Sequence, residues 1–186
     1  MRSAADVETE LRSAKGVDRR ILMFAALLRQ EAELGVDDLV VVGGSAIEIY
    51  TEGAYVSGDV DLCAPSDPIR SVLTRWGFNR TGREWARLDW KIVIDVVAPR
   101  PSGSMRLTRV VDTPYGQVRL GAVEDLILGR LALIKFWKEP DEWANAELLI
   151  NLPRLDWEYL ADRARRDGVV EELALLGKRA ARRKRT

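Results

Sequence analysis

The sequence contains no histidine, and this absence excludes several kinds of active site. Ser-His and Cys-His nucleophile pairs, an imidazole general base and a His-ligated zinc ion all need that side chain. The single cysteine, Cys63, excludes a disulfide within the chain, which predicts a protein of the reducing cytosol. Any catalytic chemistry must therefore use carboxylates, Lys, Arg, hydroxyl groups, the backbone or bound ions.

Long hydrophobic runs are also missing. No apolar stretch approaches the length of a membrane span, and the first 20 residues are charged throughout, without the apolar centre of a secretory signal. We therefore expect a cytoplasmic protein with no membrane partner. Its 186 residues, 47% hydrophobic and 31% charged, suit one ordinary globular domain, alone or with a small appendage.

The formal net charge is zero, but the basic residues are unevenly distributed. Residues 178–186 carry six Lys or Arg and no acid, whereas the rest of the chain has 23 basic against 29 acidic residues. This basic tail is either an arm that binds phosphate groups or a frayed, solvated chain end.

The pattern of apolar residues and turn signals predicts an α/β (α+β) protein. An α/β domain is expected over residues 1–120 and a C-terminal helical lobe with the basic tail over 121–186. In the first part we expect helices at 5–14 and 18–34, a short interior strand at 38–42, a helix N-capped by Ser45, a strand at 59–63 and a helix opened by Asp67. Strands should follow in 78–99, with a turn at 88–90, and in 107–120; the last part should hold helices at 122–138, 141–151, 156–167 and 169–183.

Two aspartates flank Val60 in the expected strand at 59–63. On a strand, Asp59 and Asp61 point to one face, with α-carbons about 6 to 7 Å apart. Two buried carboxylates this close need compensation, which a hard divalent cation such as Mg²⁺ provides. The alternative is a pair of turn or strand-edge aspartates in contact with water.

Two further sequence features bear on a metal or phosphate site near these aspartates. Asp95 interrupts the apolar run KIVIDVVAP, and three carboxylates converge if that strand lies beside 59–63; otherwise Asp95 reaches solvent at a strand end. The triplet Gly43-Gly44-Ser45 allows close approach of a ligand to the backbone, ahead of a helix N-terminus that can bind an anion. Its alternative is a simple glycine turn with a serine N-cap.

These residues resemble the pattern of the DNA polymerase β-like nucleotidyltransferases. In that superfamily Gly-Gly or Gly-Ser follows an apolar residue, about nine to thirteen residues intervene, and Asp-x-Asp precedes a third acid on a neighbouring strand. Here Val42, the triplet at 43–45, thirteen further residues, the segment 59–62 and Asp95 match each part. The segment 43–62 is similar to small bacterial and archaeal members, including the abortive-infection toxin group.

The resemblance covers about residues 38–150 and implies a nucleotidyltransferase-like mixed β-sheet flanked by helices, with a helical lobe after it. It implies that Gly43, Gly44 and Ser45 bind the nucleotide and that the three acids Asp59, Asp61 and Asp95 are the catalytic metal ligands. Asp95 would also help to deprotonate the attacking hydroxyl. Lys135 is the candidate for a basic residue that contacts phosphate; alternatively it lies on a solvated helix face with Glu124 and Lys138. Ala144 stands where many relatives repeat an Asp.

The expected function is a nucleotidyltransferase, dependent on Mg²⁺ or Mn²⁺, that transfers NMP from an NTP to an acceptor hydroxyl. An RNA such as tRNA, or a protein, would supply the acceptor, and a toxin-like role would add an antitoxin partner. The alternative is a non-catalytic nucleotide-binding or toxin–antitoxin interaction module of the same fold. A third, weaker possibility is a nucleic-acid-binding protein that acts through the basic tail.

Overall fold

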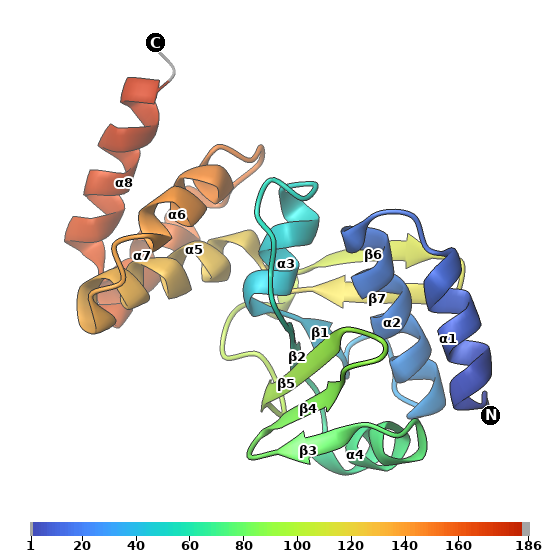
Figure 1. Ribbon diagram of the computed structural model, residues 1–186. Helices are drawn as coiled ribbons and strands as arrows, with labels where there is room; N and C mark the ends of the chain where they lie inside the picture. Colours follow the sequence, from blue (N-terminus) through green and yellow to red (C-terminus); the bar gives the residue numbers. More distant parts are fainter. Residues whose placement is uncertain (1, 184–186) are drawn as a thin grey trace. The chain divides into compact units, whose positions relative to one another are not determined.

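A computed structural model describes residues 2–183 of the protein (Figure 1). Met1 and residues 184–186, the end of the basic tail, lie outside the described part. The chain divides into two compact units, the first ending at Gly121 and the second beginning at Ala122. Within residues 2–183 it forms one seven-stranded mixed sheet and eight α-helices, which confirms the expected α/β (α+β) class.

The first unit contains the sheet. Its α-helices are α1 (Ala4–Ser13), α2 (Val17–Glu31), α3 (Gly43–Tyr50) and α4 (Ser66–Arg75), with a 3-10 turn at Met105–Leu107. Its strands are β1 (Val40–Val41), β2 (Val60–Cys63), β3 (Asn79–Thr81), β4 (Glu84–Arg87), β5 (Ile92–Ala98), β6 (Arg109–Thr113) and β7 (Gly116–Leu120). The sequence predicted a turn only at 88–90 in this region, so the turn between β3 and β4 was not expected.

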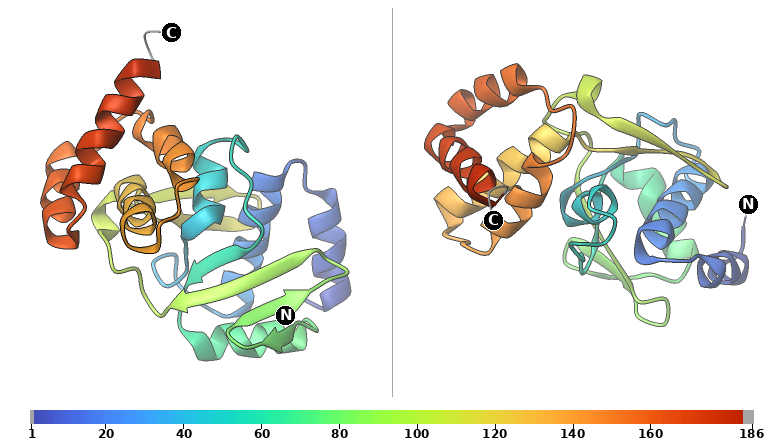
Figure 2. Two further views of the ribbon diagram at one scale, coloured as in Figure 1. Left: turned by 60° about the vertical axis from the view of Figure 1, so that its left-hand side comes forward. Right: turned by 90° about the horizontal axis from the view of Figure 1, so that it is seen from above.

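The strands follow the order β3-β4-β5-β2-β1-β7-β6 (Figures 1 and 2). β2 is parallel to β5 and β1 is parallel to β7, whereas β1 and β2 are antiparallel. β1 is an interior strand, between β2 and β7, as expected, although it is only two residues long. The parallel pairing of β2 with β5 joins two segments far apart in the sequence, and it positions the candidate site.

Apolar side chains on one face of the sheet belong to the core. Leu62 of β2 and Ile94 of β5 are fully buried. The neighbouring core contains a cluster of aromatic rings with centroids 5.7–6.4 Å apart, contributed by Phe24, Trp76, Phe78 and Trp90. Since side chains alternate along a strand, Asp61 and Asp95 project from the opposite face.

The second unit is helical. It comprises α5 (Val123–Ala132), a π-helical turn (Leu133–Trp137), α6 (Glu142–Ile150), α7 (Trp157–Asp167) and α8 (Val170–Arg183). α8 includes residues 178–183 of the basic tail, so this part of the tail is helical and not frayed. There Arg179 forms an ion pair with the buried Glu147, and its guanidinium lies 5.1 Å from the Trp143 ring centroid.

The structure was also searched for membrane-spanning segments. Over residues 2–183, no helix combines the length and the apolar character that crossing a membrane requires.

Candidate functional site

Asp61 and Asp95 lie side by side on neighbouring strands. β2 and β5 are parallel, and these two aspartates are direct partners in the register between them. Paired residues on adjacent strands, about 5 Å apart, point to the same face of a sheet. The strand that carries the third acid is therefore adjacent to the strand that carries Asp61, and the two carboxylates share one face.

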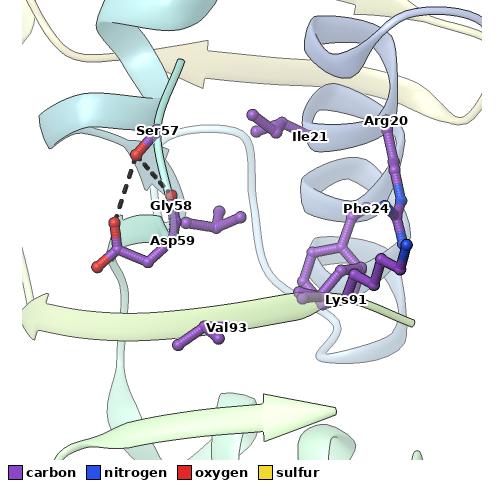
Figure 3. A pocket seen from close by; sticks show the side chains of 10 residues that line it. Arg20, Ile21, Phe24, Ser57, Gly58, Asp59, Lys91 and Val93 are labelled. Carbon is purple, nitrogen blue, oxygen red and sulfur yellow. Dashed lines mark hydrogen bonds between the residues drawn. The ribbon is translucent and has the colours of Figure 1, made fainter. Parts of the chain in front are cut away.

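Asp59 lies immediately before β2 and is held by two serines. Ser45 Oγ donates a hydrogen bond of 2.6 Å to the Asp59 carbonyl, and Ser57 Oγ donates one of 2.9 Å to the same oxygen. Ser57 Oγ also lies 3.3 Å from Asp59 Oδ1. Figure 3 shows the Asp59 carboxylate turned toward Ser57 and away from Arg20 and Lys91, beside a cavity of about 70 Å³. The backbone and the carboxylate of Asp59 thus both have defined partners.

The N-terminus of α3 lies beside the Asp61 carboxylate. The Gly44 N–H donates to Asp61 Oδ2 at 3.1 Å. A Cβ atom at Gly43 would lie 1.9 Å from Asp61 Oδ2, and one at Gly44 would lie 2.6 Å from Ser57 Oγ. Both positions therefore need glycine, because the side chains of Asp61 and Ser57 occupy the space that a Cβ atom would take.

The expected N-cap role of Ser45 is wrong. α3 begins at Gly43, with Val42 at the N-cap position and no capping side chain. Ser45 lies inside the first turn and is fully buried. Its hydroxyl donates to the Asp59 carbonyl and lies 3.4 Å from the Asp61 backbone nitrogen. The residue thus joins α3 to the start of β2 and fixes the segment that carries both acids.

A buried glutamate that sequence reasoning missed supports the same segment. Glu48 of α3 is fully buried, and its Oε2 accepts the Ser57 N–H at 2.7 Å. It is a charged residue in the otherwise apolar segment SAIEIY, which was the available signal. Through Ser57, Glu48 anchors the loop that ends at Asp59.

A second missed residue, Arg83, contacts Asp95. The Arg83 Nη2 atom lies 2.8 Å from Asp95 Oδ2. The other carboxylate oxygen, Oδ1, is buried and has no hydrogen-bond partner among residues 2–183. Arg83 comes from the unexpected β3–β4 turn. The glycine beside it, Gly82, was the available sequence signal for that turn, and in the structure its φ is 63°.

The donor groups were tested against the expected cation. Carboxylate oxygens are the ligands that Mg²⁺ and Mn²⁺ prefer, and the unpartnered Oδ1 of Asp95 fits such an ion. In the described part of the chain, however, no group of three or more acids or cysteines is gathered as a metal site. Asp59 contacts Ser57, Asp61 contacts Gly44 and Asp95 contacts Arg83. The residue types fit the cation, and binding requires their side chains to reorient.

Lys135 belongs to the second unit, in the π-helical turn. Its Nζ lies 3.1 Å from Glu172 Oε2 in an ion pair between this turn and α8. The prediction that Glu124, Lys135 and Lys138 share one helix face is wrong. The π-turn changes the helical period, and the backbone of Lys138 is left-handed, with φ of 61°. Glu124 is instead buried, and it accepts the Asp156 N–H at 2.7 Å.

Cys63 ends β2 and is buried, as expected for a small core residue. Burial, with a further contribution from the negative charge of Asp61, raises the pKa of the Cys63 thiol to about 11. The thiol is therefore protonated at neutral pH and is neither a nucleophile nor a thiolate ligand there.

This raised pKa predicts a loss of stability in alkali. The unfolded thiol loses its proton above about pH 9, whereas the folded thiol keeps it to about pH 11. The unfolded state binds fewer protons in that window, so stability falls as the pH rises. Compared with Cys63→Ala, the wild type should lose on the order of 2 kcal/mol more between pH 9 and 11. Urea unfolding of both proteins across this range measures the difference, and parallel pH profiles would contradict the prediction.

The sequence was also compared with known proteins. Neither the scan against protein-family models nor the search of curated proteins found a match.

Proposed function

We propose that the protein is a metal-dependent nucleotidyltransferase that transfers NMP from an NTP to an acceptor hydroxyl. The proposal includes a nucleotidyltransferase-like fold for the sheet and the helices around it. The observation that carries it is the pairing of Asp61 with Asp95 in the β2–β5 register, on the face opposite to the apolar core. The N-terminus of α3 lies beside the same pair of acids.

Each acid has a role in this proposal. Asp59, Asp61 and Asp95 would hold Mg²⁺ or Mn²⁺, which, when bound, neutralises charge on the phosphates and the leaving pyrophosphate. The acceptor oxygen forms a bond to the α-phosphorus as the bond to pyrophosphate breaks. Asp95 takes the acceptor proton, since its Oδ1 has no partner in the described part of the chain.

Gly43, Gly44 and Ser45 remain the proposed nucleotide-binding residues, through the backbone N–H groups of the first turn of α3. A helix N-terminus carries partial positive charge and favours phosphate groups. The Gly44 N–H already donates to Asp61, so a phosphate group would share this turn with the carboxylate. Lys135, which lies in the second unit and bonds Glu172 there, stays a prediction from the resemblance alone.

The acceptor and the biological role follow from the resemblance to the toxin group. They are proposed as a tRNA or a protein acceptor, and as a cytoplasmic toxin with an antitoxin partner. A non-catalytic module of the same fold is the second candidate. It is favoured by one observation: in the described residues each acid contacts its own partner, and no three gather as a metal site.

The two candidates are separated by a binding and a transfer experiment. The wild type should bind at least one NTP in a Mg²⁺- or Mn²⁺-dependent manner by calorimetry, and the Asp59→Asn, Asp61→Asn double variant should not. Each α-labelled NTP is then incubated with protein and a mixture of total tRNA and lysate, and the product is digested with ribonuclease or protease. Label retained in either fraction supports transfer, binding without transfer supports the module, and no metal-dependent binding contradicts the enzyme.

A further inference from the structure

The ion pair between Arg83 and Asp95 joins two groups in very different environments. The Arg83 side chain is 77% exposed, whereas the Asp95 side chain is only 3% exposed. An exposed arginine gains little from an ion pair, since water solvates it well. A buried carboxylate, in contrast, is costly without a positive partner. Asp95 therefore needs a positive charge at this position. Arg83 itself loses little when another cation replaces it there.

Arg83 also belongs to a segment that has few ties to the rest of the protein. It lies in the turn between β3, at the edge of the sheet, and β4. All three residues of β3 are exposed. Beside the turn, a cavity of about 120 Å³ is lined by Arg83, Arg80 and Trp85 together with Ser66, Ile69, Arg70 and Val96. Two other arginines line this cavity, so the guanidinium, which is already largely exposed, turns into solvent when it leaves Asp95.

We propose that Arg83 is a built-in counterion that competes with the divalent cation for Asp95. This inference rests on the proposed function, which makes Asp95 a metal ligand. Arg83 neutralises the buried carboxylate through Oδ2, and within the described residues Oδ1 lacks a hydrogen-bond partner. Cation binding and the Arg83 contact weaken each other, because two positive charges that share one carboxylate repel. Arg83 is thus a positioning residue that sets the cation affinity of the site through the β3–β4 turn.

Mn²⁺ titration of the full-length protein, followed by electron paramagnetic resonance of free Mn²⁺, tests the proposal. Arg83→Ala removes the competitor and should bind Mn²⁺ about tenfold more tightly than the wild type. Arg80→Ala is the matched control, because it removes the same charge from the same hairpin without touching Asp95. In the wild type, Arg80 donates to the Gly82 carbonyl and lies over the Trp85 ring. The Mn²⁺ affinity of Arg80→Ala should stay within about twofold of the wild type.

A double-mutant comparison assigns the effect to Asp95. In an Asp95→Asn background, the further change Arg83→Ala should leave Mn²⁺ affinity unchanged. A general electrostatic effect of Arg83 would persist in that background and would overturn the proposal. Equal affinities of the wild type and Arg83→Ala, or equal gains in Arg80→Ala and Arg83→Ala, would overturn it as well.

Hydrogen exchange of the wild type gives a second readout that does not depend on any variant folding. Saturating Mn²⁺ should raise amide exchange in the β3–β4 turn, residues 81–84, because Arg83 no longer ties the turn to β5. Unchanged or slower exchange with Mn²⁺ bound overturns the competition. Failure of the wild type to bind Mn²⁺ at all contradicts both this proposal and the enzyme, whereas binding and transfer with an unaltered Arg83→Ala affinity contradicts this proposal alone.

Discussion

Replacement of Asp61 by asparagine is expected to lower the rate of nucleotidyl transfer by about a thousandfold or more, with the fold intact. The substitution keeps the shape of the side chain and leaves an amide oxygen to accept the Gly44 N–H. It removes one of the two negative charges that the β2–β5 register places side by side. Metal-dependent binding and catalysis should therefore be lost together.

The stability of this variant separates loss of chemistry from loss of structure. Exchange of a charge-assisted hydrogen bond for a neutral one should change the free energy of unfolding by only about 1 kcal/mol. The matched control is Asp112→Asn on β6, where an exposed aspartate accepts from Gln117. It should keep full activity. Transfer by Asp61→Asn at more than about a tenth of the wild-type rate would contradict a catalytic role for this acid.

The substitution Gly43→Ala is expected to destabilise the protein by about 2–5 kcal/mol. An alanine at φ of 55° costs about 1–2 kcal/mol for the left-handed backbone. Its Cβ atom would also lie 1.9 Å from Asp61 Oδ2, so that either the carboxylate or the start of α3 must move. That overlap adds a cost of about 1–3 kcal/mol and displaces a proposed metal ligand.

Gly53→Ala provides the matched control for Gly43→Ala. Gly53 also has a positive φ, 85°, but a Cβ atom there would meet nothing within 4 Å. It should show only the backbone cost of about 1–2 kcal/mol, with unchanged Mn²⁺ affinity. Urea unfolding and Mn²⁺ titration of both variants measure the difference. Equal destabilisation of the two would show that contact with Asp61 does not explain the glycine at position 43.

The boundaries of the elements show where sequence patterns are a sufficient guide. The helices after Gly121 and the strands within 107–120 lie close to their expected positions, since their signals are local periodicity and turn residues. The N-terminus of α3 differs because Ser45 makes tertiary hydrogen bonds instead of capping. Lys135 differs because a π-turn interrupts the regular helical period assumed from the sequence.

Some residues of the candidate site were likewise predictable from local sequence patterns, and others were not. Alternation along one strand is a local property, so the sequence alone placed Asp61 and Leu62 on opposite faces. Arg83 and Glu48 were not predicted, because each acts on a group brought near it only by folding. Arg83 reaches Asp95 across the β4–β5 pairing, and Glu48 reaches the Ser57 N–H from α3.

The sequence by itself determined the mixed α and β composition, the absence of histidine chemistry and the set of three acids. These follow from residue identity and from periods of two and 3.6 residues, which short segments carry without the rest of the chain. Only the tertiary structure decided that Asp61 pairs with Asp95, that Gly43 must accommodate a carboxylate and that Arg83 neutralises the third acid. Strand register and ion pairs depend on how distant segments pack, and no local pattern specifies that packing.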